Sequence, residues 1–236
     1  MNMAKKLLLA LLASLVMAPA LAQNLDHYKV YQVEPQPIND QAWLFGQFDQ
    51  AWQDTIIREY NRHLNPVDKN GEGILNQNAH LSWYDIDSNA DVVPITVWVW
   101  NQFGEQVLTV EKPVALLVPT EKVEPGSSFP AFLDHYKVYL VNPDSAPIER
   151  PVYLRDQWGE EENFVYEPVY FAVPVYKFHN GQFFTIQNPN DHLVFYRLEP
   201  QPWFVSHLTK DQFGSKDMNT TNSELLGVPT QKEGWQ

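Results

Sequence analysis

Four histidines in this sequence are each followed, four residues later, by a tyrosine, and these pairs are the most regular polar feature of the chain. The pairs are His27 and Tyr31, His80 and Tyr84, His135 and Tyr139, and His192 and Tyr196. Neutral imidazole is a common metal ligand, and its pKa lies close to physiological pH. If the pairs surround one axis, the four histidines could together bind a metal ion or an anion. Otherwise, each histidine hydrogen-bonds a neighbouring turn and each tyrosine covers a sheet edge.

A second candidate metal site is the acidic loop that follows Pro66. Asp68, Asn70 and Glu72 offer oxygen atoms at alternate positions, as in the first half of a calcium-binding loop. The twelfth position is Ala79 rather than a bidentate glutamate, so a solvated polar loop is the competing interpretation. A second alternating run has the same ambiguity, and its members are Asp85, Asp87, Asn89 and Asp91. No cofactor is predicted, and weakly bound calcium is the one alternative that the sequence leaves open.

Sequence patterns for catalysis are scarce. The chain has no cysteine, no Gly-x-Ser-x-Gly, no His-Glu-x-x-His and no phosphate-binding glycine loop. Glu160, Glu161 and Glu162 follow a glycine of a predicted hairpin, and we expect them to form a solvated tip. No catalytic residue is predicted. A polysaccharide hydrolase stays open as an alternative, because two carboxylates can be brought together by a fold from distant positions.

Aromatic side chains are the remaining candidates for contact with a partner. Trp98 and Trp100 lie on one face of a predicted strand, and Trp203 lies near a predicted turn. Such rings can stack on sugars or anchor a partner protein. The alternative is that they pack inside the protein, as tryptophan side chains mostly do.

These residues recur because the chain contains four copies of one unit. Residues 25–31 and 133–139 are identical over seven positions, with the sequence Leu-Asp-His-Tyr-Lys-Val-Tyr. Each unit opens with the histidine–tyrosine pair, continues to a turn motif and closes with a proline. The turn motifs are Gln47-Phe48-Asp49, Gln102-Phe103-Gly104, Gln157-Trp158-Gly159 and Gln212-Phe213-Gly214. The closing pairs are Asn65-Pro66, Val118-Pro119, Val173-Pro174 and Val228-Pro229.

The pattern inside each unit predicts β-strands. In the segment 79–86, Leu81 and Trp83 face one way and the more polar residues face the other. The equivalent apolar positions of the four opening segments predict the core face: Tyr28 and Val30, Leu81 and Trp83, Tyr136 and Val138, Leu193 and Phe195. Pro113 is expected to begin a short final strand, separate from the return strand after each turn. The chain beyond its N-terminal segment is therefore predicted to be all-β.

The arrangement of the four units is open at this point. Residues 124–131 have the most linker-like composition, so we expect two tandem antiparallel β-sandwich or barrel-like domains at 23–123 and 132–236. Four units around one axis, in a four-bladed propeller-like arrangement, is the alternative. Tandem domains would keep the four histidines apart.

The N-terminal segment and the composition indicate where such a protein works. Residues 1–22 have the features of a secretory signal: Lys5 and Lys6, an apolar segment, and the cleavage motif Ala20-Leu21-Ala22. A secreted or periplasmic location is therefore expected. The formal charge is −13, and loss of the two lysines would make it −15. This charge argues against nucleic-acid partners, and no later segment is apolar enough for membrane insertion.

The ordered motifs resemble a family of uncharacterised secreted bacterial β-repeat domains. The resemblance rests on Asp-His-Tyr-Lys-x-Tyr, Asn-Gln-Phe-Gly, Lys-Pro and Val-Pro-x-x-Lys, and it covers nearly the whole chain after residue 22. Members of that family often carry cysteines where this chain has Val30 and Leu64, and Val138 and Ala172. The resemblance therefore implies apolar contacts in place of a disulfide, and it implies no activity.

Together these features predict an exported, non-enzymatic binding or structural module that contacts a protein or a glycan outside the cytoplasm. The polysaccharide-active hydrolase and a calcium- or other metal-dependent module stay open as alternatives.

Overall fold

The computed structural model describes residues 25–88, 94–143 and 148–236, so the predicted signal segment and two members of the second acidic run, Asn89 and Asp91, lie outside the described residues. The all-β prediction is confirmed. The strands are β1 (His27–Gly46), β2 (Gln53–Lys69), β3 (His80–Ser88), β4 (Ile95–Asn101), β5 (Gly104–Lys122), β6 (His135–Pro143), β7 (Arg150–Asp156), β8 (Gly159–His179), β9 (Gln182–Phe184), β10 (His192–Pro202), β11 (Ser206–Asp211) and β12 (Gly214–Trp235). Unit one contributes β1–β2, unit two β3–β5, unit three β6–β9 and unit four β10–β12.

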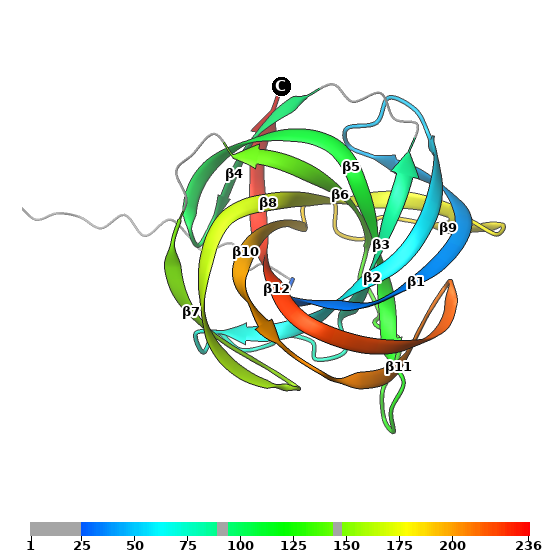
Figure 1. Ribbon diagram of the computed structural model, residues 1–236. Coiled ribbons are helices and arrows are strands. Elements are labelled where there is room, and N and C mark those ends of the chain that lie inside the picture. Colours follow the sequence, from blue (N-terminus) through cyan, green and yellow to red (C-terminus); the bar gives the residue numbers. More distant parts are fainter. Residues whose placement is uncertain (1–24, 89–93, 144–147) are drawn as a thin grey trace, which may run out of the picture.

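Eight of these strands pair in a closed ring, which we call the central ring. Every pairing is antiparallel, and the order is β1-β2-β3-β5-β6-β8-β10-β12, after which β12 pairs with β1. Figure 1 shows these strands sweeping in arcs around a common centre. Opening strands (β1, β3, β6, β10) alternate with closing strands (β2, β5, β8, β12), so the four units occupy equivalent places.

The inside of the central ring is filled by the apolar face that the alternation predicts. All eight predicted core-face residues belong to one buried cluster. The rings of Trp83 on β3 and Phe195 on β10 lie 5.5 Å apart, although these two strands stand opposite each other in the ring order. Such a contact is possible only through the interior. At Gly227 on β12, an added Cβ would lie 2.7 Å from the Phe195 ring, so a side chain there would overpack this core.

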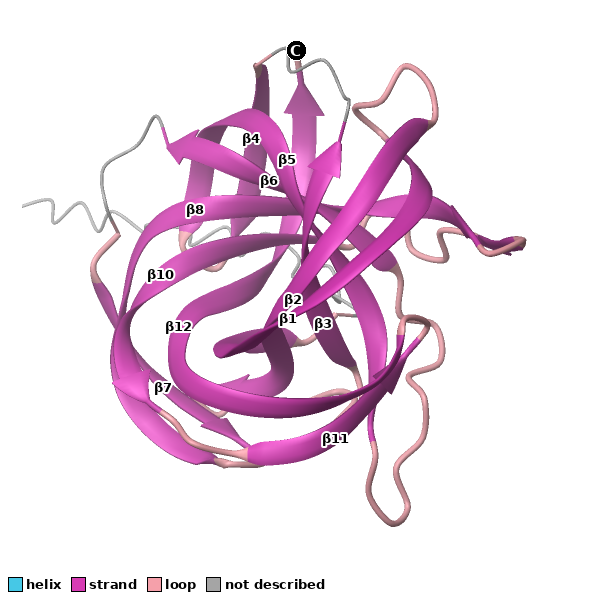
Figure 2. Ribbon diagram, turned by 45° about the vertical axis from the view of Figure 1, so that its right-hand side comes forward, coloured by secondary structure: helices cyan, strands magenta, loops and turns pink. Residues whose placement is uncertain are grey.

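Outside the ring, each unit extends a hairpin, here called an arm, whose turn motif is called its tip. The arms consist of the outer parts of β1 and β2, and of β4 with β5, β7 with β8, and β11 with β12. Each arm pairs with the end of the closing strand two units further on: β1 with β8, β4 with β12, β7 with β2, and β11 with β5. Figure 2 shows the resulting outer layer around the ring, and a second buried cluster fills the space between the layers.

The structure departs from the expected division into two tandem domains at 124–131. Strand β5 before that segment pairs with β6 after it, and β12 closes the ring onto β1. Both buried clusters draw residues from all four units. Residues 124–131 form an exposed loop that connects the paired strands β5 and β6. A surface loop needs the same polar, glycine- and proline-containing composition as a linker between domains. The units surround one axis, as in the alternative arrangement, but they share one continuous sheet instead of forming separate blades.

The expected break before the closing segment is also absent. The return strand and the closing segment form one long strand in β5 and in β8, and Pro113 lies inside β5 at a shift of register against β6. A bulge tolerates proline because the ladder hydrogen bond is already interrupted there.

Candidate binding surface

The four predicted histidines lie on the outer face of the opening strands, and three of them bind the tip of another unit. The side chains of Gln102 and His27 lie 2.6 Å apart, those of Gln47 and His192 3.0 Å, and those of Gln212 and His135 2.9 Å. In each case the glutamine belongs to the unit that follows the histidine in the cycle of four. This agrees with the interpretation in which each histidine hydrogen-bonds a turn.

Burial keeps these histidines neutral. It lowers the pKa of His27 to about 3 and the pKa of His192 to about 4, and it moves the pKa of His135 well below its ordinary value. The histidines occupy separate tip contacts. Across residues 25–88, 94–143 and 148–236, no group of three or more histidine and carboxylate side chains is placed to hold a metal ion.

The tyrosine of each pair receives the tip aromatic of the unit opposite. Ring centroids lie 4.7–5.4 Å apart in an edge-on geometry in all four contacts: Phe48 with Tyr139, Phe103 with Tyr196, Trp158 with Tyr31, and Phe213 with Tyr84. Three of the tyrosine hydroxyls also bond the residue before the glutamine: Tyr31 with Asp156, Tyr84 with Asp211, and Tyr196 with Asn101. The tip motif of each unit therefore fixes its arm against the central ring.

The third tip departs from this rule. Gln157 accepts a hydrogen bond from Lys122 instead of pairing with His80. The pKa of His80 is lowered to about 4, mainly by burial and then by the nearby Lys122 ammonium. His63 packs on His80 with ring centroids 5.5 Å apart. Neither His80 Nδ1 nor His63 Nε2 has a hydrogen-bond partner in the described part of the chain.

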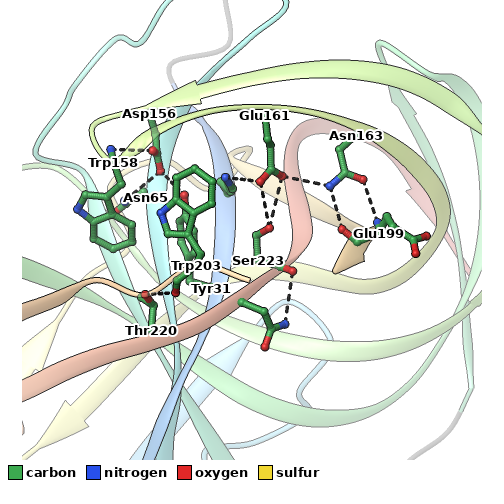
Figure 3. Close-up of polar contacts among 12 residues, drawn as sticks. Tyr31, Asn65, Asp156, Trp158, Glu161, Asn163, Glu199, Trp203, Thr220 and Ser223 are labelled. Atoms are coloured by element: carbon green, nitrogen blue, oxygen red, sulfur yellow. Dashed lines mark hydrogen bonds and ion pairs between the residues drawn. The ribbon is translucent and has the colours of Figure 1, made fainter. Parts of the chain in front are cut away.

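A buried polar network joins units one, three and four beside the third tip (Figure 3). Lys29 Nζ lies 2.7 Å from Glu161 Oε2, and both side chains are nearly inaccessible. Trp203 covers the ammonium, with its ring centroid 3.9 Å from Lys29 Nζ. Ser223 and Asn163 donate further hydrogen bonds to Glu161. The sequence predicts that Glu160, Glu161 and Glu162 form a solvated tip, but Glu161 is the buried ion-pair partner of Lys29. Trp203 packs on this ion pair.

The acidic loop after β2 uses its oxygen atoms within the protein. Asp68 accepts hydrogen bonds from the Gly73 amide and from Arg155, whose Nη2 lies 2.8 Å from Asp68 Oδ2. Asn70 Oδ1 accepts from a backbone amide on β7 at 2.8 Å, and Glu72 pairs with the Lys69 ammonium. These contacts fix the loop against the third arm.

An exposed aromatic surface lies where the first arm meets the end of β8. We call it the aromatic strip, and its members are Trp43 and Phe45 on β1, Trp52 after the first tip, Tyr176 and Phe178 on β8, and Phe183 on β9. Trp43 stands opposite Phe178 in the β1–β8 register, and Phe45 stands opposite Tyr176. The residues between them, Leu44 and Lys177, are fully buried, so the aromatic residues share the outer face.

Four rings of the strip form a contiguous group, and four of its six members are exposed to solvent. Phe45 lies 6.3 Å from Tyr176 and 5.6 Å from Trp52, while Phe183 lies 6.1 Å from Tyr176 and 5.9 Å from Trp52. Trp43 is 44% exposed, Phe178 43%, Trp52 39% and Phe183 54%. In Figure 1, β9, one of the strands that carry the strip, projects at the right of the molecule. Exposed patches of this kind are typical of surfaces that contact a partner, so we take the strip as the candidate binding surface.

The fold itself does not require aromatic residues at this place. In each arm, the residue two positions before the tip glutamine stands opposite a residue of a closing strand, and the four equivalent pairs are Phe45 with Tyr176, Trp100 with Gln231, Arg155 with Asp68, and Lys210 with Glu121. The third and fourth junctions pair residues of opposite charge, and the second junction, called the mixed junction, pairs an aromatic residue with an amide. The junction of the first arm shares this register, has a longer ladder than the third and fourth junctions, and differs from them in chemistry.

The other tryptophans singled out from the sequence lie elsewhere. Trp100 is 39% exposed and belongs to the mixed junction, and Trp98 is half-buried beside it on β4. The period-two alternation of side chains along a strand could have predicted that Trp43 and Phe45 share one outer face, and that Tyr176 and Phe178 share another. That these pairs meet depends on the contact between units one and three, which no local pattern reveals.

Residues 80–229 match the model of a family described as a repeat of unknown function (DUF7450). The match agrees with the resemblance to an uncharacterised repeat family. Searches of the curated proteins and of the solved structures gave no match. Within the described residues, no helix is long and apolar enough to cross a membrane.

Proposed function

Because the chain belongs to this repeat family, whose description assigns no activity, we propose from its geometry that it is an exported, non-enzymatic module that binds a neutral glycan on the aromatic strip. The observation that carries the proposal is the strip itself: six aromatic residues, four of them in ring-to-ring contact, stand at a junction that the same fold builds elsewhere with oppositely charged residues. Selection for folding alone gives no reason for that difference.

The chemistry of the strip favours sugars. One face of a pyranose ring carries mostly C–H groups and packs on an aromatic ring, while its hydroxyls need hydrogen-bonding partners at the edge. Side-chain amides and a carboxylate border the strip: Gln41 bonds Asp54, which stands opposite Trp43, and Gln182 is exposed on β9. The formal charge of −13 disfavours acidic polysaccharides, so the partner is a neutral one.

The test is retention of the protein by neutral polysaccharides, measured by affinity electrophoresis and by pull-down with insoluble chains, together with release of reducing sugar. The decisive variant is Phe45→Arg with Tyr176→Asp, which copies the Arg155–Asp68 pair of the third junction onto the strip. It should fold, because an equivalent site already holds that pair, and it should bind at least about tenfold more weakly.

A matched control is Phe204→Ala, which removes a side chain that is 81% exposed and lies outside the strip. Retention of the control together with loss in the double variant supports the proposal. Wild-type retention by the double variant, or the absence of saturable binding to any neutral glycan, refutes it. Release of reducing sugar would instead favour the hydrolase alternative.

A further inference from the structure

The second feature that suggests a ligand is a cavity at one end of the central ring, which we call the mouth. Its volume is about 850 Å³, and a smaller cavity of about 210 Å³ adjoins it. Arg62 and Tyr170 line both cavities and stand between them. The mouths of closed sheets are a preferred place for small ligands, because side chains from several strands converge there. This observation is independent of the aromatic strip.

The mouth exists because the four units differ at equivalent inward positions. On the closing strands these positions hold Arg62, Ala115, Tyr170 and Leu225, and on the opening strands they hold Gln32, Asp85, Leu140 and Arg197. On the closing strands, three large side chains from different units therefore surround one small one. At this level, only Ala115 and Leu225 belong to the buried apolar cluster of the ring. Trp83 forms the floor, with its ring 5.2 Å from the Tyr170 ring and 5.0 Å from the Arg62 guanidinium.

The charged side chains that line the mouth balance in sign, and two of its arginines are in ion pairs. Arg58 lies 2.5 Å from Asp87, and Arg62 is bonded to Glu224. Asp85 accepts hydrogen bonds from Asn61 at 2.6 Å and from the Trp83 indole at 3.2 Å. A cavity with paired charges has little net field to attract an ion. It does have many donors and acceptors whose second hydrogen-bonding sites remain available to neutral groups.

Two further residues show which ligand groups the mouth can receive. Glu59 stands opposite Asp85 in the β2–β3 register, and Lys112 lies at the rim on β5. Both line the cavity, so a carboxylate acceptor and an ammonium donor accompany the half-buried Tyr170 ring. A hydroxyl group both donates and accepts, and several hydroxyls on one apolar-faced ring satisfy such a lining best.

We infer that the mouth is a separate site for a short neutral saccharide, which packs on Tyr170 and exchanges hydrogen bonds with Arg62 and Glu59. The strip would then bind the extended face of a glycan chain, and the mouth would bind a small sugar or a chain end. An ionic ligand would have to compete with the ion pairs already present, and the partly buried Arg62–Glu224 pair is the costly one to break.

The test is saturation-transfer NMR and calorimetry with a panel of neutral mono- to tetrasaccharides, with glycine and acetate as zwitterionic and anionic probes. Tyr170→Ala and Glu59→Gln should each weaken saccharide binding by about tenfold or more. Glu59→Gln keeps the shape of the side chain, so it tests the acceptor without opening the ring. The strip variant Phe45→Arg with Tyr176→Asp should bind small saccharides as the wild type does.

Saccharide binding that is lost in the mouth variants and kept in the strip variant supports the inference. Saccharide binding that is unchanged in Tyr170→Ala and Glu59→Gln overturns it, and so does binding of glycine or acetate in place of the saccharides. The two proposals can be refuted independently, because the strip is tested by retention on polysaccharides and the mouth by binding of small saccharides.

Discussion

The buried histidines should make this protein sensitive to mild acid, by an amount that the structure allows us to work out. His27, His80 and His192 have pKa values of about 3, 4 and 4, lowered mainly by burial, against about 6.5 in an unfolded chain. The sign follows from linkage. Neutral histidine is the folded form, so the unfolded chain binds more protons below pH 6.5, and stability falls as the pH drops from there toward the folded pKa values.

At pH 5.0, each of the three histidines costs about 2 kcal/mol of folding free energy relative to pH 7.5, because the unfolded imidazole is almost fully protonated and the folded one is not. The three together cost about 6 kcal/mol, which is a large part of the 5–15 kcal/mol that typically stabilises a protein. Asp191 acts in the opposite direction, since burial raises its pKa to about 6. Its effect is smaller, because the carboxyl is only half-buried and screened by solvent.

The variant His192→Gln separates this effect from general acid sensitivity. At pH 7.5 it should lose about 1 kcal/mol, because the contact with Gln47 is disturbed. Between pH 7.5 and 5.0 it should lose about 2 kcal/mol less than the wild type, so the two proteins exchange order of stability. Urea denaturation at both pH values, followed by tryptophan fluorescence, measures the difference. His207→Gln is the control, because His207 is less buried. Equal pH losses in wild type and His192→Gln would refute the reasoning.

Three further substitutions test the packing, each by urea denaturation at pH 7.5. Phe103→Ala should cost about 3–5 kcal/mol because it empties a tip contact, whereas Phe204→Ala should cost less than about 0.5 kcal/mol because that ring is exposed. Gly227→Ala should cost about 1–3 kcal/mol through overpacking of the ring interior, and a neutral result would show that the interior can relax. Glu161→Ala should cost about 3–5 kcal/mol by leaving the Lys29 ammonium buried and unpaired, and Lys29→Met in the same chain should restore most of that loss.

Local sequence was sufficient to predict the strands and their inner faces. Tyr28 and Val30 point into the ring because a strand alternates with period two, and this holds wherever the strand ends up in the fold. The turns at the tips could also be predicted from local sequence, because the hairpin between β4 and β5 needs a positive φ and Gly104 supplies it, at 105°. What these patterns leave open is which strand pairs with which.

The contacts between units could not be read from the sequence. Closure of the ring depends on β12 pairing with β1, which brings together residues near the two ends of the described chain. The burial of Glu161 depends on the arm of unit three reaching Lys29 of unit one. A run of three glutamates after a glycine gives no local sign that its middle member will lose contact with water. The same is true of the mouth, whose lining comes from five strands.

Repetition and departure from repetition carry different information in this fold. Where Phe48, Phe103 and Phe213 repeat, each fills the same contact with an opposite tyrosine, so the conserved pattern within the chain is explained by folding. The junctions share a backbone register but not a chemistry, because the tip contacts also hold each arm and no particular side chain is needed at the junction itself. A junction is thus free to vary, and residues that gather there in one unit alone reflect a requirement other than stability. By this argument the aromatic strip and the unequal lining of the mouth, and not the four histidines, are where the function of this protein should be sought.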